Sequence, residues 1–325
     1  MNILPPQLSI IIPYHNEGKQ FILETIDSIE TTIDVRYEII VVDDCSDEPL
    51  KIDGIKIIRH KENLGVGEAF DTGVRKSRSK NLFLMGSDIR FIKNQWASKM
   101  VEDIKKHPDS LICTSFVPLQ ADFPEITFET AKKYSKIDLY RGASIVFFMG
   151  DDEKMHYILE AQWMPREFLP LRSSDYVAPT ESYEVACVLG AAYGVTKKWY
   201  KYLDGFWGHK KWGTLEPYIS LKSWLFGGSC LIAPHIETAH IFKSEGTHKT
   251  GLEFLIYNKI MVAWLLFSYP DKDRLINWLQ DQDFVIKGKE LIEDNIHAIQ
   301  KKRYEYRNKM KTNIPAIVEK FNLKF

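Results

Sequence analysis

Continuous apolar runs in the N-terminal part of the chain limit what it can fold into. They cover residues 8–13, 37–42 and the stretch that starts at Leu82, and only Ser9 and Glu38 interrupt them. Strands that are apolar at every position are buried on both faces, which is typical of a parallel sheet covered by helices. Amphipathic patterns typical of helices lie between these runs. Strands that alternate with helices predict right-handed βαβ units and an α/β fold with a mostly parallel central sheet.

The same patterns predict elements along the rest of the chain. Helices are expected at residues 18–32, 62–77, 95–107, 197–202 and 219–226, and further strands at 55–59, 110–116 and 230–233. Residues 118–185 show weak periodicity, so we expect irregular structure there that forms part of an acceptor site. Residues 252–325 look largely helical.

The composition indicates an ordinary globular protein. Its 43 basic and 44 acidic residues nearly cancel, which gives no overall attraction to nucleic acid or membrane. The four cysteines form no CxxC pair, which argues against a disulfide framework or zinc site and fits a reducing compartment. The strand pattern begins by residue 8, leaving no room for a signal peptide, and no apolar run reaches the roughly 18 residues of a spanning helix. We therefore expect a cytoplasmic protein without a membrane span.

Polar residues follow the apolar runs. His15, Asn16 and Glu17 come after the first, and Asp43 comes at the end of the second. Asp88 follows the run that starts at Leu82. Ligands collect at the carboxyl ends of strands in α/β sheets, and a carboxylate there can hold a divalent cation against a diphosphate. The structural alternative is that Asp88 starts a turn and that Asp43 is a turn or N-cap carboxylate.

The segments at residues 8–13, 15–17 and 41–47, followed by Asn63-x-Gly65, form an ordered set of motifs. This set resembles the family 2 glycosyltransferases of the GT-A fold. The resemblance implies that the loop after the first strand and the two aspartates after the second bind uridine, Asp43 through the uracil N3–H. The nucleotide-binding candidates are Pro13, His15, Asn16, Glu17, Asp43, Asp44, Asn63, Gly65, Ser87 and Lys243.

A second ordered set contains Trp212-Gly213, Glu216 and the segments at residues 219–224, 232–234 and 239–243. It resembles the catalytic domain of polypeptide N-acetylgalactosaminyltransferases. Together the two resemblances imply a GT-A type nucleotide-sugar-binding fold. Its catalytic domain would cover residues 1–250, with a nucleotide-binding half at about 1–117 and an acceptor and metal half at about 186–250. A helical C-terminal extension would cover 251–325.

The resemblance also implies a metal motif at the end of the Leu82 strand. The family has Asp-x-Asp there, or Asp-x-His in the N-acetylgalactosaminyl branch, whereas this chain has Gly86-Ser87-Asp88 and lacks the first acid. His240 matches the distant metal-binding histidine of that branch. Asp88 and His240 are therefore the implied ligands of Mn²⁺ or Mg²⁺, and the imidazole favours Mn²⁺. The missing acid leaves a weaker site, a water in its position, or a ligand shell completed by substrate phosphates.

Glu216 and Trp212 are the catalytic candidates. Glu216 lies where family 2 enzymes place a catalytic carboxylate, although it is one position out of register with the branch. An inverting enzyme would use it as general base on the acceptor hydroxyl. A retaining enzyme of the branch's kind uses no protein base, because the leaving phosphate oxygen takes the proton. A glutamate favoured by a helix dipole is the structural alternative. Residues 243–251 suit either a mobile lid over the diphosphate or a plain surface loop.

Basic residues are enriched near the C-terminus. Residues 287–325 hold ten Lys or Arg against five Asp or Glu, and residues 301–311 interleave basic and aromatic side chains. A solvated helix face is one explanation, and contact with a polyanion such as DNA is the other.

The sequence thus predicts a metal-dependent glycosyltransferase. It would move a sugar from a UDP-sugar, such as UDP-N-acetylgalactosamine or UDP-glucose, to a hydroxyl of a peptide, a glycan or modified DNA. Retention is favoured, because the second resemblance is to a retaining family. One alternative is transfer to hydroxymethylated bases in DNA. Another, suggested by Gly86, is a protein that binds nucleotide-sugars without catalysis.

Overall fold

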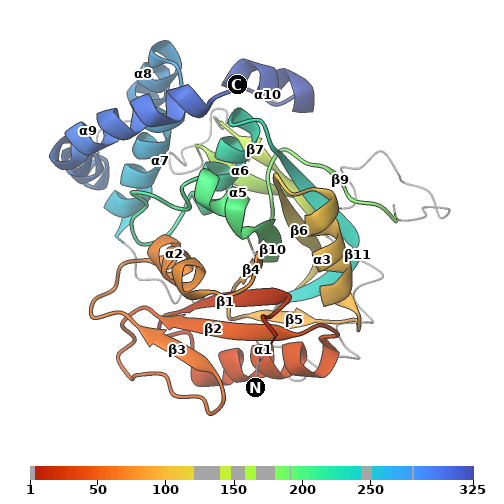
Figure 1. Cartoon of the computed structure of the whole chain (residues 1–325). Helices are drawn as coiled ribbons and strands as arrows, with labels where there is room; N and C mark the ends of the chain where they lie inside the picture. Colours follow the sequence, from red (N-terminus) through yellow and green to blue (C-terminus); the bar gives the residue numbers. More distant parts are fainter. Residues whose placement is uncertain are drawn as a thin grey trace.

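A mixed β-sheet with helices on both faces forms the centre of the protein (Figure 1). The computed structural model describes residues 4–120, 140–147, 158–165, 180–190, 192–242, 251–279 and 282–325. The strands in these ranges are β1 (Leu8–Tyr14), β2 (Tyr37–Asp43), β3 (Lys56–Arg59), β4 (Asn81–Met85), β5 (Ile89–Phe91), β6 (Ser110–Gln120), β7 (Tyr140–Val146), β8 (Glu160–Pro165), β9 (Tyr183–Glu184), β10 (Ala192–Thr196) and β11 (Ser229–Phe242). The helices are α1 (Lys19–Thr32), α2 (Val66–Lys76), α3 (Trp96–Lys106), α5 (Lys197–Tyr202), α6 (Leu215–Leu225), α7 (Leu252–Leu266), α8 (Tyr269–Trp278), α9 (Asp283–Lys309) and α10 (Ile314–Phe321).

The main path of the sheet has the order β3-β2-β1-β4-β10-β6-β11-β5. The predicted parallel arrangement holds for β3, β2, β1 and β4, and again between β6 and β11. β10 lies antiparallel between β4 and β6, and β5 is antiparallel to β11. The predicted α/β fold with a helical C-terminal part is therefore confirmed, but the sheet is mixed rather than mostly parallel.

The prediction of irregular structure across residues 118–185 is wrong for the described part of that range. β6 extends to Gln120, and β7 and β8 form an antiparallel pair, with Ala143 opposite Trp163. β7 does not alternate apolar and polar residues cleanly, and β8 does so only over its first four residues, so the period that identifies a strand was too short to predict either of them. Residues 121–139, 148–157 and 166–179 lie outside the described residues.

β11 is much longer than the predicted strand at residues 230–233. It continues past Pro234 through a register shift between Ala233 and Glu237, and then pairs with β6 as far as Phe242. A proline inside a strand normally marks an edge or a bulge, which explains why the prediction ended there. The extension carries His240 into the sheet.

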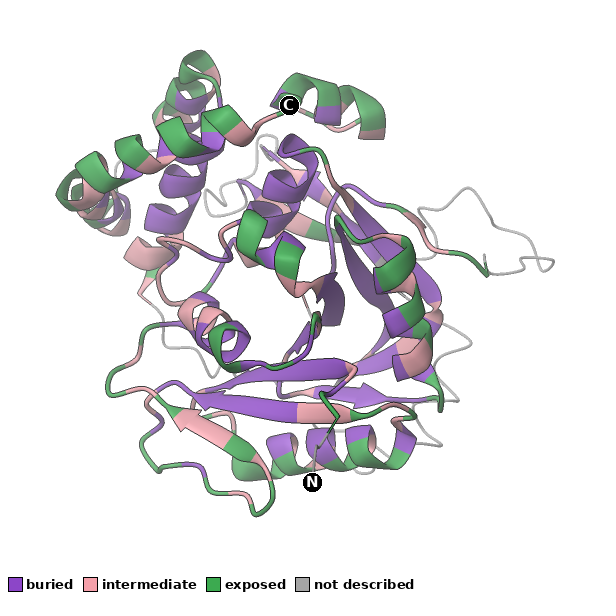
Figure 2. Ribbon diagram, viewed as in Figure 1, coloured by how far each residue is buried: buried purple, intermediate pink, exposed green. Residues whose placement is uncertain are grey.

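The two faces of the sheet bury different helices. Along β1, Ile10 and Ile12 pack in one cluster with Ile22 and Ile26 of α1, because alternate residues of a strand point to the same face. Ile11 points the other way, into a cluster with α2, α6 and α7. Figure 2 shows the resulting buried interior.

The helical C-terminal part belongs to this second cluster. α7 is buried along most of its length, and its Ile260 and Val262 pack in the same cluster as Tyr218 of α6 and Tyr306 of α9. None of the helices in the described ranges is long and apolar enough to cross a membrane. The predicted boundary between a catalytic domain at residues 1–250 and a helical extension at 251–325 stays a prediction. The apolar core is continuous across that boundary.

A buried lysine joins α7 to the hairpin of β7 and β8. Lys259 has no exposed surface and donates to the carbonyl of Ile158 at 2.5 Å and to the carboxylate of Glu160. Burial lowers the pKa of Lys259, and the charge of Glu160 opposes that shift. The pair therefore fixes the hairpin on the helix.

We expect Lys259→Ala to lower the free energy of unfolding by about 3 kcal/mol, because it leaves Glu160 and a backbone carbonyl without their donor. Urea unfolding followed by circular dichroism measures this change. Lys301→Ala, at an exposed position of α9, is the control and should stay within about 0.5 kcal/mol of the unmodified protein. Equal effects of the two substitutions would contradict a structural role for Lys259.

Candidate active site

One edge of the sheet collects most of the candidate residues. β1, β2, β3 and β4 run parallel, so the segments that follow them leave the sheet on the same side. β10 is antiparallel to β4 and β6, and β11 is parallel to β6. The start of β10 and the later half of β11 therefore reach this edge too. In open α/β sheets this is the edge at which ligands bind.

The loops after β1, β2 and β3 are joined by hydrogen bonds to Asp44. Its buried carboxylate accepts from the backbone N–H groups of Leu64 and Gly65, at 2.9 and 2.7 Å, and from Nδ1 of His60 at 2.7 Å. Its carbonyl accepts from Nδ1 of His15 at 2.8 Å. Hydrogen bonds to a buried carboxylate are strong. The predicted nucleotide-binding segments thus form one connected unit.

Asn16 attaches the first of these loops to the second. Its backbone is left-handed, with φ of 54°, a conformation that asparagine adopts more readily than most residues. Its Oδ1 accepts from the N–H of Asp47 at 2.9 Å, and its own N–H donates to Oγ of Ser46 at 3.1 Å. Pro13 is buried in β1 opposite Val42. Because Pro13 is buried in the strand, it fixes where the loop begins and is not part of the exposed surface of the loop.

Asp43 is completely buried. Its carboxylate accepts from the N–H groups of Ser46 and Leu50, at 2.9 and 3.1 Å, and from the guanidinium of Arg59 at 2.5 Å. Burial alone would raise the pKa of Asp43, but these donors outweigh it and hold the pKa below its ordinary value. The contacts are those of a turn carboxylate, and recognition of a base by Asp43 stays a prediction.

The loop after β3 also touches the second half of the chain. Nζ of Lys211 donates to the carbonyl and to Oδ1 of Asn63, at 2.6 and 3.1 Å. Gly65 lies so close to this residue that an added Cβ would be 2.4 Å from the backbone nitrogen of Lys211, and its φ of 96° also favours glycine. Lys211 precedes Trp212, which is 47% exposed. Asn63, Gly65 and Trp212 are thus brought to one place.

Asp88 and His240 lie side by side. Oδ1 of Asp88 is 3.6 Å from Nε2 of His240, and the two side chains are 20% and 17% exposed. The strand pairing that places His240 opposite Ile89, next to Asp88, creates this contact. A carboxylate and an imidazole that solvent reaches suit a divalent cation that takes further ligands from a substrate. In the described part of the chain, no group of three or more His, Cys, Asp or Glu side chains is arranged for a metal.

The lack of a side chain at Gly86 leaves room for the carboxylate of Asp88. An added Cβ at residue 86 would lie 2.6 Å from Oδ1 of Asp88. The Asp88 carboxylate therefore occupies the space that a side chain at position 86 would need. An acid at position 86 would require that carboxylate to move.

Glu216 lies in the first turn of α6, close to the start of β10. Its carboxylate packs against Gly190, where an added Cβ would be 2.1 Å from Oε1 of Glu216. Burial raises the pKa of Glu216 to about 7, and the nearby charge of Glu160 adds to the shift. Perturbed carboxyl groups of this kind are enriched in active sites.

The positions of the remaining candidates, Ser87, Glu17 and Lys243, say less about their roles. Ser87 is buried, and its Oγ has no hydrogen-bond partner among the residues described. Glu17 is partly buried in the loop after β1. Lys243 lies outside the described residues, as does the rest of the predicted lid at residues 243–251 except Gly251.

Several supporting residues escaped the sequence analysis. Arg59 and His60 bind the two aspartates after β2, and Lys211 joins the two halves. His209 is buried, donates from Nε2 to the carbonyl of Gly213 at 2.6 Å, and has its pKa lowered by burial to about 4. The only available signal was that Arg59 ends a predicted strand and His60 directly follows it. Which carboxylate they bind depends on strand order.

Comparison with known proteins agrees with this geometry. Residues 9–158 match the family model described as Glycosyl transferase family 2. Polypeptide N-acetylgalactosaminyltransferase 14 of Homo sapiens is 26% identical over 251 residues, which are 74% of this chain and 42% of that protein. Polypeptide N-acetylgalactosaminyltransferase 8 of Drosophila melanogaster is 27% identical over 290 residues, which are 82% of this chain and 45% of that protein. The chain spans less than half the length of these two relatives.

A solved structure resembles the whole chain. It is described as the crystal structure of GalNAc-T7 with UDP, GalNAc and Mn²⁺, and it matches with a TM-score of 0.70 at 18% identity, covering 99% of this chain and 57% of that one. The predicted resemblance is confirmed: the chain has the GT-A glycosyltransferase fold and resembles the catalytic domains of polypeptide N-acetylgalactosaminyltransferases.

Proposed function

We propose that this chain transfers a sugar from a UDP-sugar to a hydroxyl acceptor and requires a divalent metal ion to do so. The observation that carries the proposal is the contact between Asp88 and His240, which are far apart in the sequence and 3.6 Å apart at the ligand-binding edge. The resemblance to proteins named as N-acetylgalactosaminyltransferases supports the reaction class. The similar fold of a protein solved with UDP, GalNAc and Mn²⁺ supports UDP-N-acetylgalactosamine as the donor and Mn²⁺ as the ion.

Asp88 and His240 would hold the ion, and oxygens of the donor's diphosphate would complete its ligand shell. A bound cation there neutralises negative charge on a departing diphosphate. An imidazole beside a carboxylate favours Mn²⁺ over Mg²⁺. The unit formed by the loops after β1, β2 and β3 would bind the nucleotide. Its many internal hydrogen bonds mean that it is ordered before the ligand arrives.

We favour retention of configuration and no protein base. With a pKa of about 7, much of Glu216 is protonated at neutral pH, and a protonated carboxyl group donates a hydrogen bond rather than accepting a proton. In this proposal Glu216 positions the sugar or the acceptor. A peptide hydroxyl is the acceptor that the names of the relatives support best.

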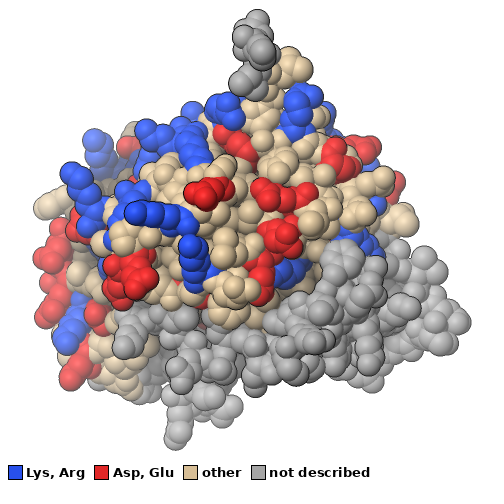
Figure 3. Space-filling model, turned by 90° about the horizontal axis from the view of Figure 1, so that it is seen from below, with Lys and Arg blue, Asp and Glu red and all other residues tan. Residues whose placement is uncertain are grey.

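Transfer to modified DNA receives no support. The basic side chains of residues 301–311 are largely engaged within the chain: Lys302 pairs with Asp204 and Glu305, and Lys309 donates to the carbonyl of Tyr202. On the side of α1, which is the face seen from below in Figure 3, Lys and Arg are interspersed with Asp and Glu, so this face also lacks a uniformly basic surface. The interleaved pattern therefore has an intramolecular explanation.

Metal-dependent release of UDP tests the proposal. A panel of UDP-sugars incubated with the chain and Mn²⁺ should give UDP, and chelation should stop its release. We expect Asp88→Ala and His240→Ala each to lower this activity by at least about 100-fold with little change in the unfolding midpoint, since both residues are partly exposed.

His235→Ala is the matched control for this experiment. His235 is also on β11 and contacts an aspartate, Asp103, at 3.2 Å, but it is not one of the proposed ligands. Its substitution should leave UDP release within about threefold of the unmodified protein. Near-full activity of either Asp88→Ala or His240→Ala would place the metal site elsewhere. Binding of UDP-sugars without any turnover would favour the non-catalytic alternative.

Substitution of Glu216 by glutamine distinguishes the two mechanisms. If Glu216 only positions a ligand, we expect kcat/KM to fall by less than about tenfold, because the amide retains a donor and the shape. A general base would instead contribute about 10² to 10⁴-fold. Initial rates of UDP release at saturating Mn²⁺ measure the difference, and a loss above 100-fold would contradict a mechanism without a protein base.

The raised pKa of Glu216 also predicts how stability depends on pH. Because its pKa is higher in the folded chain than in the unfolded chain, ionisation opposes folding. The free energy of unfolding should therefore fall, relative to Glu216→Gln, as the pH rises from about 4.5 to about 7, and then level off. We expect a difference of about 3 kcal/mol, measured by urea unfolding of both proteins at several pH values. Parallel curves for the two proteins would contradict it.

A further inference from the structure

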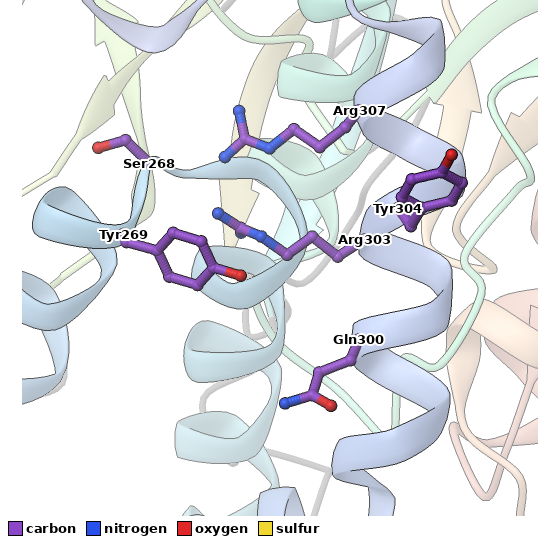
Figure 4. Close-up of a pocket in the computed structure, with 6 residues that line it drawn as sticks. All are labelled: Ser268, Tyr269, Gln300, Arg303, Tyr304 and Arg307. Carbon is purple, nitrogen blue, oxygen red and sulfur yellow. The ribbon is translucent and has the colours of Figure 1, made fainter.

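A separate polar pocket lies on the helical C-terminal part. Its volume is about 530 Å³, and it is lined by Ser268, Tyr269, Gln300, Arg303, Tyr304 and Arg307 (Figure 4). It lies at the C-terminal end of α7, whereas the first turn of α7 packs beside Gly213, near the candidate active site. A helix of this length spans about 20 Å. The pocket is therefore distinct from the edge that carries Asp88 and His240.

Two guanidinium groups line the inner side of the pocket. Arg303 and Arg307 lie one turn apart on α9 and reach toward Ser268 and Tyr269, as Figure 4 shows. Arg303 donates to the carbonyl of Trp264 and to the hydroxyl of Tyr269, and Arg307 donates to the carbonyl of Phe267 at the end of α7. Capping these carbonyls is the structural role of both arginines. Each guanidinium has five N–H donors, so several remain after these bonds.

The positive charge of this pair is not balanced within the described residues, where no carboxylate makes an ion pair with either arginine. Burial lowers the pKa of Arg307, and the charge of Arg303 lowers it further. Asp273 pairs with Lys272, and the carboxylate of Asp271 accepts from the hydroxyl of Ser268 at the edge of the pocket. An anion in the pocket would offset the repulsion between the guanidinium groups.

Aromatic rings form the outer side. Tyr269 is 60% and Tyr304 72% exposed, which is high for large aromatic side chains. The guanidinium carbon of Arg303 lies 4.4 Å from the centre of the Tyr269 ring, so that ring is held in place. Gln300 lies one turn before Tyr304 and adds amide donors and an acceptor. The pocket thus combines flat apolar faces with a cationic end and groups that bind hydroxyls.

We propose that this pocket binds an acidic sugar, a pyranose ring that carries a carboxylate or another anionic group. The anion would meet the free N–H groups of Arg303 and Arg307, which present the fork that recognises carboxylates. The apolar face of the ring would lie against Tyr304, and its hydroxyls would meet Gln300 and Ser268. A volume of about 530 Å³ is within the usual range of small-ligand pockets. A simple anion would leave the aromatic faces unused, and a neutral sugar would leave the guanidinium groups unused.

Calorimetric titration of the full chain with glucuronate, glucose and inorganic phosphate tests the proposal. At constant ionic strength we expect glucuronate to bind at least about tenfold more tightly than glucose or phosphate. Arg307→Gln should weaken glucuronate binding about tenfold. Tyr304→Ala should weaken it severalfold, while Tyr304→Phe, which keeps the ring, should not. Because Tyr304 is largely exposed, its variants test the site without a risk to folding.

Two controls complete the experiment. Lys301→Gln removes one positive charge from an exposed position of α9 outside the pocket, so binding should not change. Asp88→Ala should also bind glucuronate normally, which separates this pocket from the proposed active site. The proposal is overturned if glucuronate does not saturate a site, if phosphate or glucose binds equally well, or if Tyr304→Ala has no effect. Loss of binding in Asp88→Ala would assign the ligand to the active site and would overturn it too.

Discussion

The antiparallel pairing of β10 between β4 and β6 is the constraint on which the candidate site depends. Without this strand, the parallel unit of β3, β2, β1 and β4 would end at β4. β10 extends the sheet, and its direction brings the neighbourhood of Gly190 and Glu216 to the edge where β4 ends. Through β6 it also positions β11, and thereby His240. The site is thus assembled by backbone hydrogen bonds between segments that are remote in the sequence.

Much of the N-terminal half of the fold could be predicted from the sequence, because fully buried strands have an unmistakable pattern and their ends fall near polar residues. Asp88 and His240 could be proposed as partners only through a resemblance. Their contact requires β5 and the extension of β11 beyond Pro234, and neither has a local signature. For a similar reason, the sequence could not show which side chains hydrogen-bond to Asp43 and Asp44. Their hydrogen-bond partners, Arg59 and His60, come from the neighbouring strand and the loop after it.

Buried cations provide many of the links between the helices. Lys222 of α6 is fully buried, donates to the carbonyl of Gly205 and lies 3.9 Å from the centre of the Tyr218 ring. Burial lowers the pKa of Lys222 to about 7, and Asp204 and Asp71 oppose the shift. Lys259 and Arg303 play similar parts at α7. Such groups satisfy carbonyls that would otherwise be buried without donors, and a count of charges along the sequence cannot distinguish them from surface lysines and arginines.

The burial of α7 has a consequence for how this protein can be divided. The segment that carries most of the candidate active site ends before α7, yet α7 fills the apolar core beneath α6 and the sheet. The part of the chain that must fold together is therefore longer than the part that carries the candidate active site. Any related chain that kept the site but lacked α7 would have to supply another apolar helix in its place. Selection can accordingly preserve this segment for its shape and hydrophobicity alone, while the exposed faces of the helices that follow it can acquire binding surfaces of their own.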